Sequence, residues 1–239
     1  MSETLVIMPT YNERMNIRHS IEQLFKHNPD VHLLVVDDNS PDGTAAEVER
    51  LLPTYSKKLF LLKRPGKAGL GPAYLAGFAW AFERNYQRIA EMDADGSHRA
   101  SDLGALLSQK DFDLVIGSRW ISGGSVVNWP LSRILISKIG NLYTRIILGT
   151  KVRDMTAGFR VYRSSLLQRL PLDKIASQGY SFQVEMAYRS IRLNASVTEV
   201  PITFVEREHG ASKMSTAIVF EALWLVTKWG VARIFRSKS

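Results

Sequence analysis

Residues 33–43 read LLVVDDNSPDG, an aliphatic run followed at once by a dense set of turn-forming residues. The run is typical of a buried strand, and the Asp, Asn, Pro and Gly residues that follow end it. A second run of this kind, Leu5–Met8, stops at Pro9. Between the two, residues 13–26 carry apolar side chains at helical spacing. This part of the chain therefore predicts two strands joined by a helix.

The same alternation continues along the chain. Strands are predicted at 59–62, 88–92 and 114–116, and helices at 44–52 and 69–86. Alternating strands and helices are typical of a parallel sheet with right-handed crossovers. We therefore expect an α/β fold, in which one domain forms a Rossmann-like nucleotide-binding sheet flanked by helices.

Polar clusters follow four of the predicted strands, at the points where those strands end. They comprise residues 9–13, 37–43, 93–98 and 117–119. Ligands of open α/β sheets bind beyond the carboxyl ends of the strands. We therefore expect the four clusters to converge on one crevice.

The segment Asp93-Ala94-Asp95 carries the strongest chemical signal. Two carboxylates that flank a small residue at a strand end can face one divalent ion, and oxygen ligands favour Mg²⁺ or Mn²⁺. A surface turn without a ligand is the alternative for so short a motif. Asp38, at the end of the 33–36 strand, is placed to meet a ribose or a base.

Two common phosphate-binding motifs do not occur. Residues 9–13 read PTYNE, where a dinucleotide-binding fold has a Gly-rich turn. Residues 66–71, GKAGLG, have neither that spacing nor the spacing of a P-loop. They are interpreted as a strand-to-helix loop whose Lys67 could meet a phosphate. Neither NAD chemistry nor P-loop hydrolysis is supported.

Charge is divided unequally along the 239 residues. The net charge is +8, but residues 1–129 hold 14 Lys and Arg against 16 Asp and Glu, whereas residues 130–239 hold 17 against 7. A basic second half predicts an anionic partner, either nucleic acid, membrane headgroups or a phosphorylated substrate. The absence of cysteine excludes disulfides and a cysteine nucleophile.

Taken together, the motifs resemble those of family 2 glycosyltransferases with the GT-A fold. The resemblance rests on residues 9–13, 35–44 and 93–95. Other segments narrow it to the polyprenol-phosphate (dolichol-phosphate) mannose synthases, namely 66–71, 117–119 with 123–124, 154–160, and 207 with 212–213. The resemblance implies an inverting transfer of mannose from GDP-mannose to a polyprenyl (dolichyl) monophosphate. The product would serve lipid-linked glycan synthesis or protein mannosylation.

The resemblance also implies roles for individual residues. Donor binding is implied for Pro9, Tyr11, Glu13, Val36, Asp38, Lys67, Asp93, Ala94, Arg207 and Lys213. Metal binding, by Mg²⁺ or Mn²⁺, is implied for Asp93, Asp95 and Ser97, where Ser97 stands at the position of a Gln in some relatives. Acceptor-phosphate binding is implied for Arg119, Arg133 and Ser137, and catalysis for Asp95, Arg119 and Arg133. His98 is expected to be structural rather than a ligand.

Residues 131–149 are predicted to form a helix with two faces. Leu135 and Ile139 belong to an apolar stripe, and Arg133 and Ser137 to a polar one. This pairing suits a phosphate joined to a hydrocarbon tail, although a solvated helix face is the alternative. An acceptor phosphate, whose second pKa is about 6, needs no general base. The enzyme then has to align the acceptor oxygen and neutralise the departing GDP.

Four residues could have either a ligand-binding or a structural role. Gln183 and Glu185, on a predicted helix at 181–192, either touch sugar hydroxyls or pack at the edge of the core. Asp154 and Arg160 either bind the sugar or form a buried ion pair with each other.

The last part of the chain is predicted to contain a lid and an amphipathic helix. Residues 207–213 combine Gly and Ser with charged residues, which favours a loop that closes over substrate; an exposed loop is the alternative. Residues 215–235 carry Trp224 and Trp229 and end in basic residues, a pattern that favours docking on an anionic membrane. Packing of this helix on the protein's own core is the alternative.

We therefore divide the chain into a catalytic domain, 1–213, and an amphipathic membrane-interface helix, 214–239. The catalytic domain has a nucleotide-sugar part, 1–120, and an acceptor part, 121–213. No secretory signal and no membrane span is predicted. We expect a cytoplasmic protein, peripheral on the cytoplasmic face of a membrane, with a separate membrane-anchor protein as a possible partner.

Three rival functions share part of this evidence. A polyprenyl-phosphate glucosyltransferase that uses UDP-glucose would have the same fold and acceptor. A nucleic-acid-binding protein would match the basic half, but the basic residues interleave with aliphatic stripes, which suits lipid better. A non-catalytic membrane-surface protein would not need Asp95. The sequence favours mannosyl transfer without a nucleic-acid partner.

Overall fold

The protein is described by a computed structural model that covers residues 3–175, 177, 179–206 and 216–236. Its central sheet contains seven strands in the order β3-β2-β1-β4-β7-β5-β8, and β6 pairs with β9 in a small second sheet. The elements are β1 (Thr4–Thr10), α1 (Arg14–His27), β2 (His32–Asp37), α2 (Thr44–Leu51), β3 (Leu59–Lys63), α3 (Leu70–Phe82), β4 (Arg88–Glu91), α4 (Ala100–Leu107), β5 (Leu114–Ser118), β6 (Ser125–Val127), α5 (Leu131–Leu148), β7 (Arg160–Arg163), α6 (Ser164–Arg169), η1 (Leu172–Lys174), α7 (Tyr180–Arg192), β8 (Val197–Pro201), β9 (Thr203–Val205) and α8 (Thr216–Arg236).

The sheet is mixed, so the prediction of a wholly parallel sheet is wrong in one place. Strand β7 runs antiparallel to both of its neighbours, β4 and β5. Strands β1, β2, β3 and β4 are parallel, and β5 has the same direction because it opposes β7 as β4 does. The carboxyl ends of β1, β2, β4 and β5 therefore lie on one edge, as the positions of the polar clusters predict.

Most of the predicted elements are present, with small shifts at their ends. Strand β1 continues through Pro9 to Thr10, which pairs with Asp37. Helix α3 ends at Phe82, four residues earlier than predicted. Asn85 adopts a left-handed φ of 57° beyond it, a conformation that ends the helical path and turns the chain into β4.

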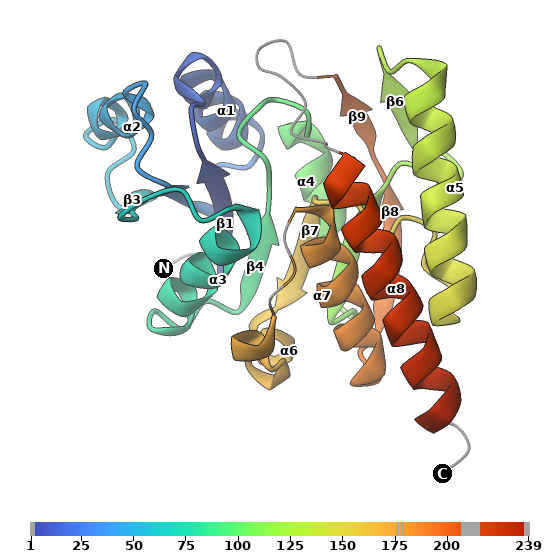
Figure 1. Ribbon diagram of the computed structural model, residues 1–239. Coiled ribbons are helices and arrows are strands. Elements are labelled where there is room, and N and C mark those ends of the chain that lie inside the picture. Colours follow the sequence, from blue (N-terminus) through green and yellow to red (C-terminus); the bar gives the residue numbers. More distant parts are fainter. Residues whose placement is uncertain (1–2, 176, 178, 207–215, 237–239) are drawn as a thin grey trace.

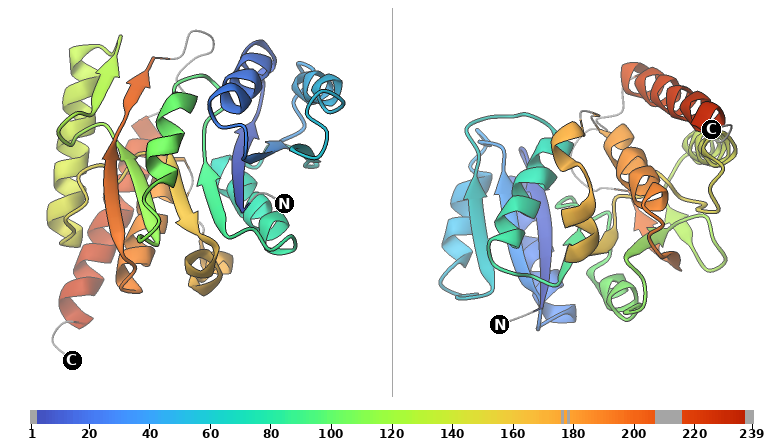
Figure 2. Two further views of the ribbon diagram at one scale, coloured as in Figure 1. Left: turned by 180° about the vertical axis from the view of Figure 1, so that it is seen from behind. Right: turned by 90° about the horizontal axis from the view of Figure 1, so that it is seen from below.

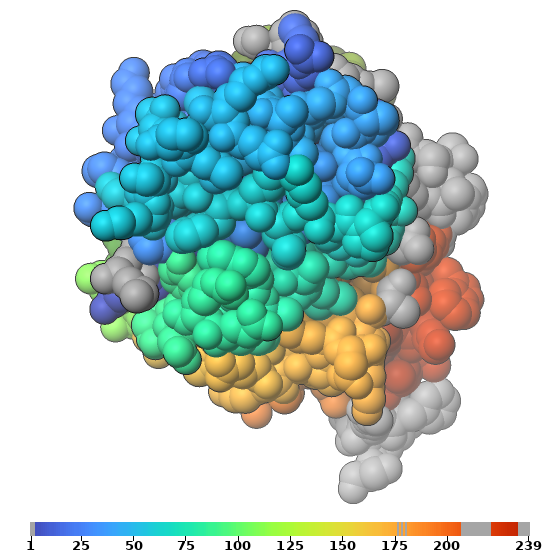
Figure 3. All heavy atoms as spheres, turned by 90° about the vertical axis from the view of Figure 1, so that its left-hand side faces the viewer, coloured from blue at the N-terminus to red at the C-terminus, as the bar shows by residue number. Residues whose placement is uncertain are grey.

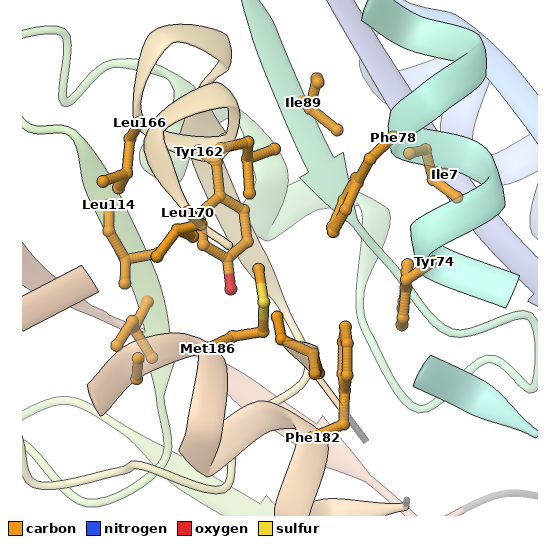
Figure 4. Packing of buried hydrophobic residues seen from close by; sticks show 14 of the residues in the cluster. Ile7, Tyr74, Phe78, Ile89, Leu114, Tyr162, Leu166, Leu170, Phe182 and Met186 are labelled. Atoms are coloured by element: carbon orange, nitrogen blue, oxygen red, sulfur yellow. The ribbon is translucent and has the colours of Figure 1, made fainter. Parts of the chain in front are cut away.

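Two hydrophobic cores lie on the two faces of the sheet. One packs α1, α2 and α4 against the sheet, and the other packs α3, α6 and α7 against it; Figure 2 shows these layers from behind and from below. In the second core, Tyr74 and Phe78 of α3 approach Phe182 and Met186 of α7 (Figure 4). The rings of Tyr74 and Phe182 stack with their centroids 5.9 Å apart. This packing ties the first part of the chain to residues about a hundred positions later.

Helix α8 packs alongside α5 and α7 at one side of the molecule (Figure 1). Val226 is 2% exposed, the Trp229 ring stacks on Tyr188, and the Tyr143 hydroxyl lies 2.6 Å from Thr227 Oγ1. The inner side of α8 therefore packs on the protein itself. No helix in the described part of the chain is long and apolar enough to cross a membrane.

The opposite side of the molecule belongs mainly to the first half of the chain. Figure 3 views it from the side of α2 and β3, where the blue and cyan segments cover most of the face. The orange segment around α6 adjoins them below α3. The two halves of the chain thus share one sheet and one surface.

Candidate active site

Strands β1 and β2 end side by side and bring the first two polar clusters together. The Thr10 hydroxyl donates to Asp37 Oδ1 at 2.9 Å, and the Asp38 N–H donates to the Thr10 carbonyl at 3.0 Å. The carboxylate of Asp37 also accepts hydrogen bonds from the N–H and the hydroxyl of Ser40. Asp37 is therefore structural, and it braces the turn that follows β2.

Asp38 organises the loop that carries Lys67. Its Oδ1 lies 2.5 Å from Nη1 of Arg64, and its Oδ2 accepts the N–H groups of Ala68 and Gly69 at 3.0 and 3.3 Å. The loop in turn places Lys67 Nζ 4.4 Å from the centre of the Tyr11 ring. The structure thus brings together three predicted donor-site residues.

The other residues predicted to bind the nucleoside differ in accessibility. Pro9 and Glu13 are partly exposed beside Tyr11, and Glu13 Oε2 accepts a hydrogen bond from Asn16. Val36 is 0% exposed and packs in the core, so only its backbone could reach a ligand. Arg207 and Lys213, and with them the predicted lid, lie outside the described residues.

The acidic turn after β4 is held by its own short contacts. Asp95 Oδ1 accepts the N–H of Ser97 at 3.0 Å and its hydroxyl at 2.6 Å. The Ala94 carbonyl accepts the hydroxyl of Ser20 at 2.7 Å. Ser97 is 1% exposed, so its contacts orient Asp95; its role as a metal ligand stays a prediction.

His98 supports this turn from below. It is 3% exposed, its ring stacks on Phe159 at 4.9 Å, and its Nδ1 accepts the N–H of Asp93 at 3.0 Å. A neutral His98 therefore carries its proton on Nε2, which lies 3.8 Å from Asp93 Oδ2. These contacts agree with the structural role that the sequence favours for His98.

Buried polar groups lie on one side of Asp93, whose own side chain is 34% exposed. A Cβ atom on Gly158 would lie 3.9 Å from both Asp93 Oδ2 and Gln183 Nε2. Neither amide atom of Gln183 makes a hydrogen bond of normal geometry to the described residues, nor does either carboxylate oxygen of Glu91. Burial raises the pKa of Glu91 to about 7, although Arg160 and the nearby Gln183 favour its charged form. Gln183 thus lies at the edge of the acidic turn, 1% exposed.

Oxygen atoms alone make up the donor set of this turn, which fits Mg²⁺ or Mn²⁺ rather than a softer ion. The described residues contain no group of three or more His, Asp or Glu side chains that could enclose an ion. Asp93 and Asp95 would therefore hold an ion jointly with other oxygen ligands, such as phosphate oxygens of a substrate. The residues present fit a metal of this kind.

Arg119 occupies a buried ion pair with Asp154. Its Nε and Nη2 donate to the two carboxylate oxygens at 2.8 and 2.7 Å, and Nη2 also donates to Thr156. Asp154 is 0% exposed. The proposed pairing of Asp154 with Arg160 is therefore wrong, because Arg160 donates instead to carbonyl groups of the 155–157 loop and of α7 and to the Tyr162 hydroxyl.

A pocket of about 130 Å³ brings the three predicted acceptor residues together between α5 and α8. Arg119, Arg133 and Ser137 line it together with apolar side chains that include Ile136, Leu223 and Val226. The guanidinium of Arg133 lies 3.9 Å from the centre of the Trp129 ring, and its Nη1 lies 2.5 Å from Glu206 Oε1. The pocket joins cationic groups to an apolar wall.

Strand β9 connects this pocket with the acidic turn. The Val205 N–H donates to the Ser97 carbonyl at 3.1 Å, and Phe204 bridges to His98. The Phe204 ring lies 5.4 Å from the His98 ring on one side and 5.5 Å from the Arg119 guanidinium on the other. The Phe204 side chain therefore lies between the acidic turn and the arginine-lined pocket.

Several contacts and partner residues of this site are not evident from the sequence. Asp154 pairs with Arg119 across 35 positions, and neither Trp129 nor Phe204 nor Glu206 is marked by a motif. Glu185 accepts hydrogen bonds from Ser177 and Arg189, which indicates packing at the edge of α7. The partners of Arg119 and Arg133 lie 35 and 73 positions away along the chain, and no motif in the sequence marks them as pairs.

The sequence matches known proteins over most of its length. A model of the family described as Glycosyl transferase family 2 matches residues 5–170. A polyprenol monophosphomannose synthase of Mycolicibacterium smegmatis is 48% identical over 230 residues, which is 95% of this chain and 87% of that protein. An undecaprenyl-phosphate mannosyltransferase of Micrococcus luteus is 50% identical over 229 residues, 95% of this chain and 94% of that one.

Solved structures of more distant proteins share the fold. A mannosyltransferase of Pyrobaculum calidifontis, in complex with GDP-Man and Mn²⁺, aligns over 98% of this chain with a TM-score of 0.62 and 17% identity; this chain spans 64% of its length. Glucosyl-3-phosphoglycerate synthase of Mycobacterium tuberculosis, with Mn²⁺ and UDP-glucose, aligns over 96% of this chain and 78% of that one, with a TM-score of 0.65 and 17% identity.

Proposed function

The chain belongs to glycosyl transferase family 2, and we propose that it transfers mannose from GDP-mannose to a polyprenyl monophosphate. It has the GT-A fold expected of such an enzyme. The observation that carries the proposal is the pocket of Arg119, Arg133 and Ser137, which joins cations to an apolar wall next to the acidic turn. Both curated relatives are named for mannose, so the alternative with UDP-glucose is not favoured.

The donor nucleotide binds in this proposal at the carboxyl ends of β1, β2 and β4. Pro9, Tyr11 and Glu13, with the backbone of Val36, border the nucleoside. Asp38 holds the loop of Lys67 in position, since its carboxylate already accepts hydrogen bonds from that loop. Lys67, and with it Arg207 and Lys213, would meet the diphosphate. Asp93, Ala94 and Asp95 lie beneath the same groups.

A divalent ion is proposed at Asp93 and Asp95, with Ser97 orienting Asp95 or binding the ion itself. When bound, such an ion neutralises charge that develops on the departing diphosphate. Mn²⁺ in the complexes of distant relatives supports a divalent ion. Transfer activity measured separately with Mg²⁺ and with Mn²⁺ decides between the two ions.

The acceptor phosphate binds to Arg119, Arg133 and Ser137. Two guanidinium groups and a hydroxyl can hold a phosphate through several charge-assisted hydrogen bonds. Its oxygen is already anionic at neutral pH, so the protein needs no general base. Asp154 keeps the Arg119 guanidinium in one orientation, and the protein thereby aligns the acceptor for attack on the anomeric carbon with inversion.

The hydrocarbon part of the acceptor points to a membrane, and the surface around the pocket supports this. We define the α5/α8 apolar surface as the large, exposed apolar residues of these two helices: Leu131, Leu135, Ile136, Ile139, Leu142, Ile146, Leu223, Trp224 and Val231. Of the described residues, only Met15 adds another large apolar side chain of comparable exposure. Such a concentration is typical of an interaction surface.

We propose that this surface lies on the cytoplasmic face of a membrane and makes the enzyme peripheral. Lys228 lies 5.0 Å from the centre of the Trp224 ring, and Lys138 lines a hollow together with Leu142, so both cations are close enough to this surface to meet anionic headgroups. In this arrangement residues 1–213 form the catalytic domain, with its donor part in 1–120 and its acceptor part in 121–213. The membrane-interface part is residues 214–239, which include α8 (Thr216–Arg236), and we propose a separate anchor protein as a partner.

One experiment tests the function directly. The purified protein is incubated with polyprenyl phosphate and radiolabelled GDP-mannose or UDP-glucose, in Mg²⁺, in Mn²⁺ and with a chelator. We expect a labelled lipid from GDP-mannose only, and its loss with the chelator. Label from UDP-glucose alone would overturn the choice of donor. Tight, salt-dependent binding of nucleic acid without any transfer of sugar would overturn the proposal that the protein is a glycosyltransferase.

A further inference from the structure

Glu206 is an acidic residue paired with Arg133, one of the basic residues that line the acceptor pocket. Its Oε1 lies 2.5 Å from Nη1 of Arg133, and the two side chains are 28% and 18% exposed. The Arg133 guanidinium also lies over the Trp129 ring, 3.9 Å from its centre. A phosphate that uses this edge of Arg133 has to replace the Glu206 carboxylate, because both anions need the same N–H donors.

The two arginines of the pocket differ in how their carboxylates are held. Asp154, the partner of Arg119, is 0% exposed, and its own backbone N–H donates to Glu199. The carboxylate of Glu206 is partly open to water, which lowers the cost of separating it from Arg133. The Asp154 pair is therefore a permanent part of the site, whereas the Glu206 pair can exchange.

The backbone of Glu206 is anchored close to the donor side of the site. Its N–H donates to the Val127 carbonyl of β6 at 3.0 Å, and the preceding residue, Val205, donates to Ser97 of the acidic turn. Exchange of the carboxylate thus needs only side-chain rotation at the end of β9. The strand itself stays in place.

The geometry points to Glu206 as an internal anion that occupies Arg133 until the polyprenyl phosphate displaces it. This inference rests on the proposed function, because it assumes that Arg133 binds the acceptor. A resident anion lowers the affinity of every phosphate by the same factor. Only a phosphate whose tail also binds the apolar wall makes up the loss. Glu206 therefore leaves the ratio of the two affinities unchanged, but it keeps small phosphate ions from filling the site at concentrations at which a lipid phosphate still occupies it.

The test compares wild type with Glu206→Gln, which keeps the shape of the side chain and removes its charge. Binding of a water-soluble, ten-carbon isoprenyl phosphate is measured by titration calorimetry without donor. Inhibition of transfer by inorganic phosphate is measured in parallel. We expect the variant to bind the isoprenyl phosphate about two- to fivefold more tightly, as the loss of a partly exposed ion pair implies. Inhibition by inorganic phosphate should strengthen by a similar factor.

Two further variants distinguish the loss of the Glu206–Arg133 ion pair from a change in overall charge. Glu221→Gln removes one negative charge from α8 beside the pocket-lining Ala222 and Leu223, and no ion pair of Glu221 occurs among the described residues. It should bind like wild type. In the background of Arg133→Gln, the Glu206 substitution should give no gain, because its target is missing.

The outcomes are distinct. Weaker binding by Glu206→Gln would mean that Glu206 positions Arg133, and it would overturn the inference. An equal gain from Glu221→Gln, or a gain that persists without Arg133, would also overturn it. If wild type binds the isoprenyl phosphate and the variant binds it equally well, the inference alone fails. If neither protein binds it, both the inference and the proposed function fail.

Discussion

Ser97, two positions along the chain, helps to orient Asp95. The N–H and hydroxyl of Ser97 both donate to the same oxygen, Oδ1, which fixes the plane of the carboxylate. An amide at this position can accept the same hydrogen bonds through its own Oδ1. Charge and geometry at Asp95 can therefore be separated by a single substitution.

We predict that Asp95→Asn lowers kcat/KM by about 100-fold or more, because charge at the leaving group is no longer balanced. The unfolding temperature should stay close to that of wild type. Steady-state kinetics and calorimetry check the two parts. Ser97→Ala serves as the comparison and should cost much less, since the N–H contact remains. Near-normal activity of Asp95→Asn would exclude a role for this charge.

Glu91 supplies a second residue-level prediction. Burial raises its pKa to about 7 from 4.5, so the folded protein binds a proton that the unfolded chain has released between these values. Stability from this group is present at low pH, is lost as pH rises from about 4.5 to about 7, and changes little above pH 7. The full shift corresponds to about 3 kcal/mol.

We therefore predict that Glu91→Gln removes most of this slope. Urea unfolding of both proteins at pH 5, 6, 7 and 8, in the presence of a chelator, provides the measurement. Wild type should lose stability relative to the variant across this series. A parallel pH dependence of the two proteins would show that Glu91 does not titrate in this range.

Among the elements, α5 has the opposite orientation to an ordinary surface helix. Its polar residues Asn141 and Thr144 are 3% and 5% exposed, whereas Leu135 and Ile139 are 58% and 64% exposed. The polar side is needed inside because Arg133 and Ser137 line the pocket. The apolar side is then left on the outside, where only another apolar phase can cover it.

The double substitution Leu135→Gln with Ile139→Gln should weaken binding to anionic phospholipid vesicles by about tenfold or more, as the transfer free energy of two aliphatic side chains implies. Folding should be unaffected because both side chains are exposed. Vesicle sedimentation and circular dichroism test this. Met15→Gln is the matched control, since Met15 is 75% exposed on α1, away from this surface. Equal loss in both variants would argue against a specific membrane face.

The packing of helices against the central sheet includes very close approaches at some glycines. A Cβ atom on Gly77 of α3 would lie 2.7 Å from Cγ2 of Ile7 in β1, well inside van der Waals contact. Gly104 of α4 has far more space, since the nearest atom would lie 3.9 Å away, on Asn28. These two helical glycines therefore separate packing from backbone effects.

We predict that Gly77→Ala destabilises the protein by about 1–3 kcal/mol, because a methyl group has to be forced into a packed core. Gly104→Ala should be neutral or stabilise by about 0.5–1 kcal/mol, because alanine favours the helix. Denaturant unfolding measures both changes. Equal effects would mean that α3 can shift away from β1 at little cost.

Much of the fold and part of the site could be predicted because they depend on local patterns. Buried runs such as 33–36 and the helical spacing of 13–26 mark elements directly, and polar residues at strand ends mark the edge where ligands bind. The three-residue strands β6 and β9 carry no such pattern, and the direction of β7 depends on its neighbours. The roles of the predicted site residues remain predictions.

By itself, the sequence determined that the chain builds an α/β sheet with an acidic turn and a basic, two-faced helix at 131–149, because residue order alone sets periodicity. Only the tertiary structure decided which face of that helix points outward and which carboxylate meets each arginine. Asp154 pairs with Arg119 rather than with Arg160, and Glu206 pairs with Arg133. Such choices depend on which segments fold together across tens of residues, and the energy of an ion pair depends on burial, which a linear pattern does not contain.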